Sequence, residues 1–258
     1  MEIVNRQVLI TGANRGIGRA FAKICAQDKA FLHLVLRKHD AELIKEMEEA
    51  GAKSVTIYEA DLSSRENVQE LLHKLKDTPI DILFNNAGVL TGGLLEEQPL
   101  DDVYRMLQVN VNSLIQITQG LLPGMLARKR GKIINNSSVS AYMNFPSAST
   151  YAASKAAVAA FTNCLHLELK DTSVSTLLLI TPAIKTRMFE EIETLYGKNL
   201  VVPTDGISPA KYAEMIREAV LHDLTVLEPS GLTGISLKLA RFAKPLFDFE
   251  ISRRFRRG

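Results

Sequence analysis

A tyrosine and a lysine four residues apart are the residues whose spacing most directly predicts chemistry. Tyr151 and Lys155 lie near the start of an alanine-rich, helix-like segment. One helical turn separates them, so their side chains share a face. A free phenol has a pKa of about 10, and a neighbouring ammonium lowers it by favouring the phenolate. The pair predicts a residue that exchanges a proton with a substrate oxygen, although ordinary surface pairs share this spacing.

A glycine-rich turn follows the first strand-like run and opens a helix-like one. It reads Thr11-Gly12-Ala13-Asn14-Arg15-Gly16-Ile17-Gly18. Glycines let the backbone approach a pyrophosphate closely, and the N-terminus of the next helix favours its negative charge. We therefore expect a dinucleotide to be held by Gly12, Asn14, Arg15, Gly16, Ile17 and Gly18.

Two basic residues at the end of the second strand-like run bear on which dinucleotide binds. In NAD-binding folds a carboxylate about 20 residues after the turn holds the ribose hydroxyls, but here Arg37 and Lys38 occupy that place. A guanidinium suits the 2′-phosphate of NADP, to which it can donate two hydrogen bonds. With Arg15 in the turn, these residues favour NADP(H) as the cofactor. The alternative is that they only solvate a loop.

Alternating strand-like and helix-like segments must position these residues. The apolar, strand-like runs are 7–10, 32–36, 54–58, 80–84, 132–135, 174–180 and 224–227. The amphipathic segments between them are 18–27, 41–50, 65–76, 101–128, 150–170 and 209–222. This alternation predicts an α/β fold, a doubly wound, Rossmann-like parallel sheet of seven strands with helices on both faces.

The length of 258 residues and the ordinary composition predict one dinucleotide-binding and catalytic domain over residues 1–258. Two segments fall outside the alternation. Residues 187–208 are expected to form a substrate lid, and residues 230–258 a basic amphipathic C-terminal extension.

Charge and cysteine content exclude several classes of partner. The net charge of +2 is too small to indicate a nucleic-acid partner. Cys25 and Cys164 are far apart and lack metal-ligand spacing, so neither a disulfide nor a metal site is expected. No apolar run is long enough to span a bilayer, and the N-terminus lacks a signal-peptide pattern. We expect a cytoplasmic protein.

Further residues make the pattern specific to one family. Asp61 follows the third strand-like run, Asn85-Asn86-Ala87-Gly88 follows the fourth, and Asn110 and Ser138 come later. Together with the glycine-rich turn and Tyr151-x-x-x-Lys155, they occur in the order and spacing of the short-chain dehydrogenase/reductase family. The chain resembles the compact, roughly 250-residue type of that family over about residues 6–222.

The resemblance implies a role for each catalytic candidate. Tyr151 would give a proton to a carbonyl in reduction and accept one in oxidation, and Ser138 would hold the substrate oxygen. Lys155 would bind the nicotinamide ribose and acidify Tyr151, while Asn110 would hold a water that links Lys155 to solvent. Ser137 adjoins Ser138, and the thirteen-residue interval before Tyr151 selects Ser138.

The resemblance also implies cofactor contacts. Asp61 and Leu62 would line the adenine, and Asn86, Ala87 and Gly88 would line its ribose. After the sixth strand the family has Pro-Gly-x-x-x-Thr beside the nicotinamide carboxamide, whereas this chain has Pro182-Ala183-Ile184-Lys185-Thr186. Ala183 puts the backbone path in doubt, because alanine adopts positive φ less readily than glycine. Pro182, Ile184 and Thr186 remain available for the contact.

The substrate-side segments and the tail are apolar. The candidate lining segments are 90–95, 142–145 and 188–200, which favours an apolar carbonyl or alcohol. The tail interleaves apolar and basic residues, with Pro245 between two short helical pieces. It could lie on an anionic membrane, but packing over its own cleft or a second subunit is the favoured interpretation. A homodimer is expected rather than the family's tetramer.

Two other functions compete with the expected NADP(H)-dependent carbonyl reductase or alcohol dehydrogenase. One is a non-catalytic NADP-sensing protein on the same fold, which would not need the acid at Tyr151. The other is a sugar-nucleotide epimerase, which usually carries a larger C-terminal domain than the residues after Leu227 allow.

Overall fold

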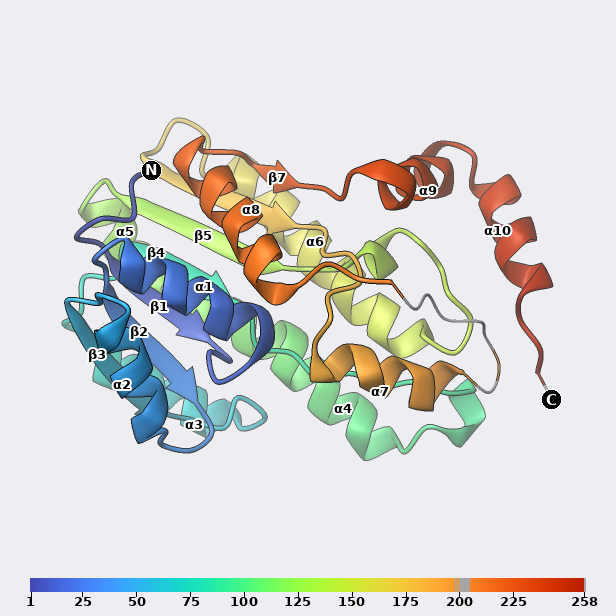
Figure 1. The fold of residues 1–258 in the computed structure, drawn as a ribbon, viewed down its shortest axis with the longest axis horizontal. Coiled ribbons are helices and arrows are strands. Elements are labelled where there is room, and N and C mark those ends of the chain that lie inside the picture. Colours follow the sequence, from blue (N-terminus) through green and yellow to red (C-terminus); the bar gives the residue numbers. More distant parts are fainter. Residues whose placement is uncertain (198, 200–204, 258) are drawn as a thin grey trace.

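The structure is a computed structural model that describes residues 1–197, 199 and 205–257. Its centre is one parallel sheet with strand order β3-β2-β1-β4-β5-β6-β7 (Figure 1). The strands are β1 Gln7–Thr11, β2 Phe31–Leu36, β3 Ser54–Glu59, β4 Ile82–Asn85, β5 Gly131–Asn136, β6 Val174–Leu179 and β7 Val226–Leu227. The predicted seven-stranded, doubly wound sheet is confirmed, and the direction of strand order reverses between β1 and β4.

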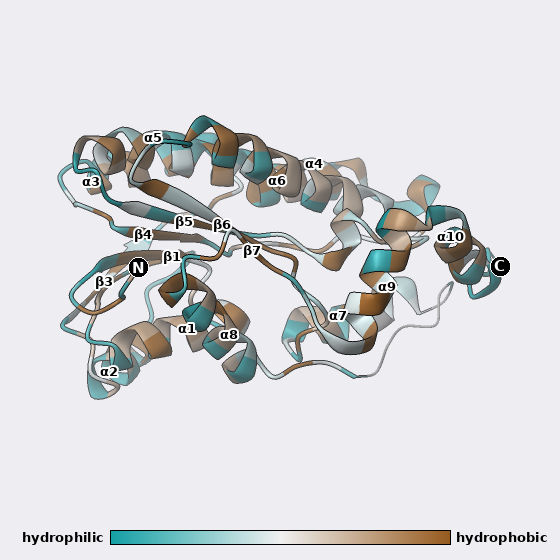
Figure 2. Cartoon of the chain, turned by 90° about the horizontal axis from the view of Figure 1, so that it is seen from above, coloured by the Kyte–Doolittle hydropathy of each residue, from teal (hydrophilic) through white to brown (hydrophobic). Residues whose placement is uncertain are grey.

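Helices cover both faces of the sheet (Figure 2). One face packs against α1 (Gly16–Gln27), α2 (Ala41–Glu49) and α8 (Pro209–Leu221). The other packs against α3 (Arg65–Leu75), α5 (Ser113–Ala127) and α6 (Ser149–Glu168). The central strands are apolar on both faces and almost fully buried, as a sheet covered twice requires. This burial fixes the strand ends, where the functional side chains lie.

The segment 101–128 was expected to form one helix, and the structure corrects this. It contains α4 (Leu100–Leu107), a π-helical turn (Gln108–Asn112) and then α5. A π turn inserts an extra residue, which a search for 3.6-residue periodicity does not reveal. Asn110 lies in this turn.

Residues 187–208 include a helix that the alternation did not predict. Helix α7 spans Arg187–Tyr196. Residue 198 and residues 200–204 of the expected lid lie outside the described residues.

The C-terminal extension forms two helices at one end of the molecule (Figure 1). They are α9 (Gly231–Phe242) and α10 (Lys244–Arg253), with Pro245 in the first turn of α10. Leu237, Ala240 and Phe247 pack in a cluster with Met143 of the loop after β5. The extension therefore packs on its own chain. Of the helices in the described part of the chain, none has the length and apolar character to cross a membrane.

Candidate active site and dinucleotide cleft

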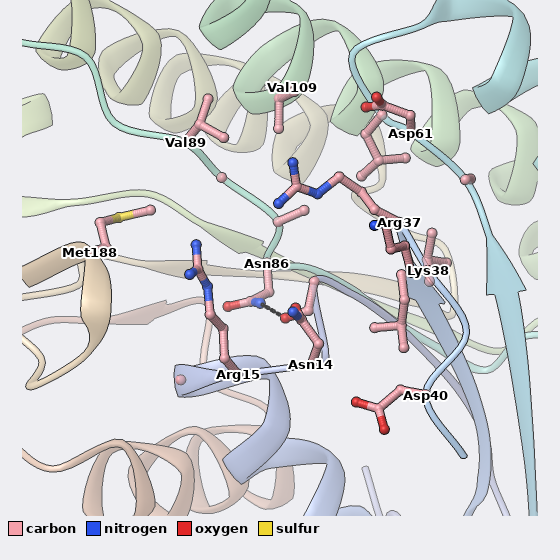
Figure 3. Close-up of a pocket in the computed structure, with 18 of the residues that line it drawn as sticks. Asn14, Arg15, Arg37, Lys38, Asp40, Asp61, Asn86, Val89, Val109 and Met188 are labelled. Carbon is pink, nitrogen blue, oxygen red and sulfur yellow. Dashed lines mark hydrogen bonds between the residues drawn. The ribbon is translucent and has the colours of Figure 1, made fainter. Parts of the chain in front are cut away.

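A cleft of about 1040 Å³ opens where the carboxyl ends of β1, β2 and β4 meet (Figure 3). Dinucleotide-binding sheets hold their ligand at this reversal of strand order. The lining includes most predicted cofactor residues, namely Gly12, Asn14, Arg15, Gly16, Ile17, Arg37, Lys38, Asp61, Leu62, Asn86, Ala87, Gly88 and Thr186. The other predicted cofactor residues, Gly18, Tyr151, Lys155, Pro182 and Ile184, do not line it. The sequence thus identified one continuous cleft from residues far apart in the chain.

The glycine-rich turn has the geometry that its composition predicted. Gly12 and Gly16 adopt φ of +67° and +58°, which L side chains rarely tolerate. At Gly18 a Cβ would lie 2.4 Å from the carbonyl oxygen of Gly12. Gly18 is therefore required for close packing of α1 on the turn rather than for lining the cleft. The Asn86 side chain holds the turn by donating from Nδ2 to the carbonyl oxygens of Thr11 and Gly12.

Basic side chains enter the cleft from several elements. Arg15 comes from the start of α1, Arg37 and Lys38 come from the end of β2, and their side chains extend along the cleft (Figure 3). Arg105 of α4 also lines the cleft, although the sequence had not indicated it. It pairs with Asp102, 3.2 Å away, on the solvent side. These cations make the cleft suited to an anion.

Asp61 lies at the same end of the cleft. Hydrogen bonds from the backbone N–H and hydroxyl of Ser63 lower its pKa, and the charges of Arg37 and Arg105 lower it further. Asp61 is therefore ionised at neutral pH, and two arginines lie close enough to interact with it. This proximity places Arg105 beside the residues predicted to contact the adenosine.

The two neighbouring serines have different environments. Ser137 is buried and its hydroxyl donates to the carbonyl oxygen of Lys155, 2.7 Å away, which anchors the second turn of α6. The Ser138 hydroxyl accepts from the backbone N–H of Ser140 and is hydrogen-bonded to Tyr151. Of the two serines, Ser138 is thus the one hydrogen-bonded to the tyrosine, and its role in holding the substrate oxygen stays a prediction.

Burial dominates the acid–base properties of the tyrosine and lysine. Desolvation raises the pKa of Tyr151 to about 12, against a smaller lowering by the hydrogen bond with Ser138. Desolvation of the phenolate has the larger effect, and the acidification of Tyr151 by the Lys155 ammonium stays a prediction. Desolvation also lowers the pKa of Lys155 to about 8. Lys155 Nζ lies 5.7 Å from the Tyr151 ring centre and donates to the carbonyl oxygen of Asn136.

Asn110 connects the segment after β4, at Val89, to α6 through hydrogen bonds. Its Oδ1 accepts from the backbone N–H of Val89, and its Nδ2 donates to the Val89 carbonyl oxygen and the Ser154 hydroxyl. A Cβ on Gly88 would lie 3.4 Å from Asn110 Oδ1 and 3.7 Å from Lys155 Nζ. The three residues thus meet at one point. The water predicted between Asn110 and Lys155 stays a prediction.

Comparison with known proteins decides the family. The family profile described as short chain dehydrogenase matches residues 6–196. The chain belongs to the short-chain dehydrogenase/reductase family. It is therefore an oxidoreductase by family, and the resemblance predicted from its motifs is confirmed.

Three related proteins illustrate the range of this family. A fatty acyl-CoA reductase of Acinetobacter baylyi is 32% identical over 85% of this chain and 74% of its own length. A short-chain dehydrogenase/reductase of Burkholderia phymatum, solved with NAD, is 26% identical with a TM-score of 0.81, covering 97% of this chain and 96% of that one. A serine dehydrogenase solved with NADP+ is 25% identical with a TM-score of 0.75, covering 88% and 95%. Structures of the family thus hold either dinucleotide.

The departure from the family at Ala183 is accommodated without strain. Ala183 does not adopt a positive φ. Its carbonyl oxygen accepts from the N–H of Ile207, and the N–H of Lys185 donates to the Ile207 carbonyl oxygen. Ile184 is buried in the core, so its side chain does not reach the cleft. Thr186, whose Cγ2 lies 3.1 Å from a Cβ built on Gly16, remains beside the turn.

Helix α7 is attached to the substrate side by Tyr196. The Tyr196 hydroxyl donates to the carbonyl oxygen of Thr91, 2.9 Å away. Burial raises the pKa of Tyr196, and the charge of a Tyr151 phenolate would raise it further, so the two phenols lie near each other. The ring packs so closely on Gly92 that a Cβ there would lie 1.8 Å from Cε1. Tyr196 thus belongs to the active-site wall, and the sequence had offered it only as one of several lid residues.

Other predicted substrate-lining residues have mixed positions. Leu95 is exposed to solvent. Phe145 contacts Phe247 of α10 edge to face, with ring centres 6.2 Å apart, and Tyr142 lies under the Arg241 guanidinium. These two aromatic residues connect the substrate side to the C-terminal helices. Leu200 lies outside the described residues.

Proposed function

We propose that the protein is an NADP(H)-dependent oxidoreductase that interconverts an apolar carbonyl compound and its alcohol. One observation carries this proposal: a buried Tyr151 phenol, hydrogen-bonded to Ser138, lies beside Lys155, and Lys155 Nζ donates to the carbonyl oxygen of Asn136, which lines the dinucleotide cleft. The cleft fits the cofactor, because the positive φ of Gly12 and Gly16 forms the tight turn before α1 and basic side chains line the space beside it. When bound, NADPH supplies a hydride to the carbonyl carbon.

Tyr151 supplies the proton in this scheme. With a pKa of about 12 it is a neutral phenol at neutral pH, so it can donate to a substrate oxygen that is held by Ser138. Loss of the proton leaves a phenolate near the Lys155 ammonium, which stabilises it. In oxidation the same residues act in reverse, with Tyr151 accepting the hydroxyl proton.

Preference for NADP(H) rests on the basic groups. Arg15, Arg37 and Lys38 line the adenosine end, and we include Arg105 among the groups that bind the 2′-phosphate. A phosphate that contacts several cations is favoured by charge-assisted hydrogen bonds, each worth about 1.5–3 kcal/mol. The NAD-bound relative shows that the fold alone does not decide the cofactor, so the proposal depends on these side chains.

The apolar substrate is proposed from the wall of the site. The Tyr196 ring and the apolar segment around Phe145 are available to it, and one relative is named a fatty acyl-CoA reductase. We also propose that the protein forms a homodimer, for which Leu100 and Tyr104 of α4 supply exposed apolar surface. Light scattering of the purified protein tests the homodimer separately.

The test is titration with NADPH and NADH, monitored by nicotinamide fluorescence, followed by addition of apolar ketones and aldehydes. The expected result is tighter NADPH binding and cofactor oxidation by some members of the panel. The matched variant Tyr151→Phe should bind NADPH as the native protein does and lose at least about a hundredfold in turnover. Near-native turnover of this variant would exclude proton transfer by Tyr151. Tight NADPH binding with no turnover across the panel would support the sensor function instead.

A further inference from the structure

Helices α9 and α10, which contact each other, expose large apolar side chains to solvent. The exposed fractions are 84% for Leu232, 64% for Ile235, 87% for Phe242, 64% for Leu246 and 63% for Phe249. We call these five residues the tail stripe. Contiguous exposed apolar side chains of this size mark interaction surfaces.

The tail stripe is separate from the face that packs on the protein. On α9, Leu232, Ile235 and Phe242 fall within an arc of about 80° at 100° per residue, while Leu237 and Ala240 face the core cluster. Figure 2 shows hydrophobic residues around α9 at the end of the molecule. The helix therefore has two apolar faces, and within the described part of the chain one of them is covered while the other is exposed.

Basic side chains flank the tail stripe. From residue 237 to the C-terminus there are seven basic and two acidic residues, a net charge of 7 − 2 = +5. Arg241, Lys244, Arg254 and Arg257 form ion pairs with carboxylates, so the positive charge beside the stripe comes from Lys238, Arg253 and Arg256. Lys238 is exposed on α9 next to the stripe, and the Arg253 guanidinium lies 5.8 Å from the ring centre of Phe249. An apolar face bordered by cations is complementary to a bilayer surface that contains anionic lipid.

We propose that α9 and α10 dock on the surface of an anionic bilayer, with the tail stripe inserted at the boundary of headgroups and acyl chains. A second copy of the chain is a poorer occupant. A two-fold contact pairs the same patch on both copies, so it would bring each basic border, with its Lys238, against the other. The opposite face of the same helices packs on Met143 and Phe145, so docking holds the loop after Ser138 near the lipid.

The chain contains no tryptophan, so a single introduced one reports on this surface alone. Phe242→Trp should show a blue shift with phosphatidylcholine vesicles that also contain phosphatidylserine. The shift should weaken with added salt, which screens the charge attraction. Leu167→Trp, at an α6 position with 71% of the leucine exposed, is the matched control and should show no shift.

Co-sedimentation with the same vesicles tests which residues contribute to binding, using variants of the chain without an introduced tryptophan. The double variant with Leu232→Ser and Phe242→Ser should have a lower vesicle partition coefficient, by roughly tenfold or more for each side chain replaced. Lys238→Glu should lower it roughly tenfold, because two units of charge change near the lipid. Lys74→Glu on α3 is the matched charge control and should leave partitioning unchanged.

Three results would overturn the proposal: no binding of the native chain to anionic vesicles, unchanged binding of the stripe variants, or a lower mass of the stripe variants by light scattering. The last would assign the surface to a second copy. Because neither cofactor nor turnover enters these measurements, they stand apart from the test of the oxidoreductase activity.

Discussion

Replacing Lys155 by Met should stabilise the protein at neutral pH while abolishing its activity. Lys155 is 5% exposed, and burial lowers its pKa from 10.5 to about 8. A difference of 10.5 − 8 = 2.5 units corresponds to about 3 kcal/mol that the charged form costs the folded state. Met, of similar length, avoids this cost but leaves the Asn136 carbonyl oxygen without its bond from Nζ, which costs about 1 kcal/mol. The expected net gain is about 2 kcal/mol, or roughly 4–8 °C in Tm.

The pH dependence of the free energy of unfolding determines when Lys155→Met is the more stable protein. Because the pKa is lower in the folded state, the unfolded chain binds more protons between about pH 8 and 10.5. Native stability from this group therefore rises with pH across that window. Lys155→Met lacks the effect, so its advantage should be full at pH 7 and largely gone near pH 10. Calorimetric Tm values of the two proteins at several pH values measure it.

A second buried lysine provides the control. Lys132 is fully buried, but it donates to Asp223 Oδ1 at 2.7 Å and to the Leu224 carbonyl oxygen at 3.0 Å. Desolvation also lowers the pKa of Lys132, but the hydrogen bond and charge of Asp223 oppose this, so Lys132→Met removes a partly compensated charge and should raise Tm at pH 7 less than Lys155→Met does. If Lys155→Met is less stable than the native protein at pH 7, or if its advantage does not change with pH, then desolvation is not what lowers the Lys155 pKa.

Three further predictions concern cofactor binding, the packing of Tyr196 at the substrate side, and the roles of Ser137 and Ser138. Arg105→Ala should weaken NADPH binding by roughly tenfold more than NADH binding, and equal weakening would mean that Arg105 does not contact the 2′-phosphate. Gly92→Ala should displace the Tyr196 ring, since the new Cβ would lie 1.8 Å from Cε1, and so raise the KM for substrate with the NADPH Kd unchanged. Ser138→Ala should lower kcat at least about a hundredfold with native Tm, whereas Ser137→Ala should lower Tm and spare kcat; the reverse pattern would exchange their roles.

The sequence predicted the parts of the site that depend on local chain geometry. The glycine-rich turn needs positive φ at Gly12 and Gly16, and a strand-to-helix turn of that composition has few other conformations. The interval from Tyr151 to Lys155 sets a shared helix face by itself. Apolar alternation gave the sheet because strands covered on both faces must be apolar throughout. Each of these signals lies within a short stretch of chain.

What the sequence did not predict depends on contacts between distant segments. Arg105 reaches the cleft only because the packing of α4 brings it close to Asp61, which follows β3. A lone arginine in an amphipathic helix gives no signal of this. The Tyr196 ring packs on Gly92, which lies 104 positions earlier in the sequence. The π turn at Asn110 leaves no mark in the hydrophobic periodicity. More accurate secondary-structure propensities would not predict where these residues lie, because tertiary packing determines their positions.

Burial affects the acid–base properties of Tyr151 and Lys155 in a way that bears on mechanism. Spacing alone predicted that Lys155 lowers the pKa of Tyr151, but burial disfavours the charged form of both groups, giving values of about 12 and about 8. Burial thus keeps Tyr151 protonated and ready to donate in reduction, while it makes Lys155 easier to deprotonate than a free lysine. Because Lys155 Nζ lies 5.7 Å from the Tyr151 ring centre, a phenolate formed in reduction would favour the charged form of Lys155 again.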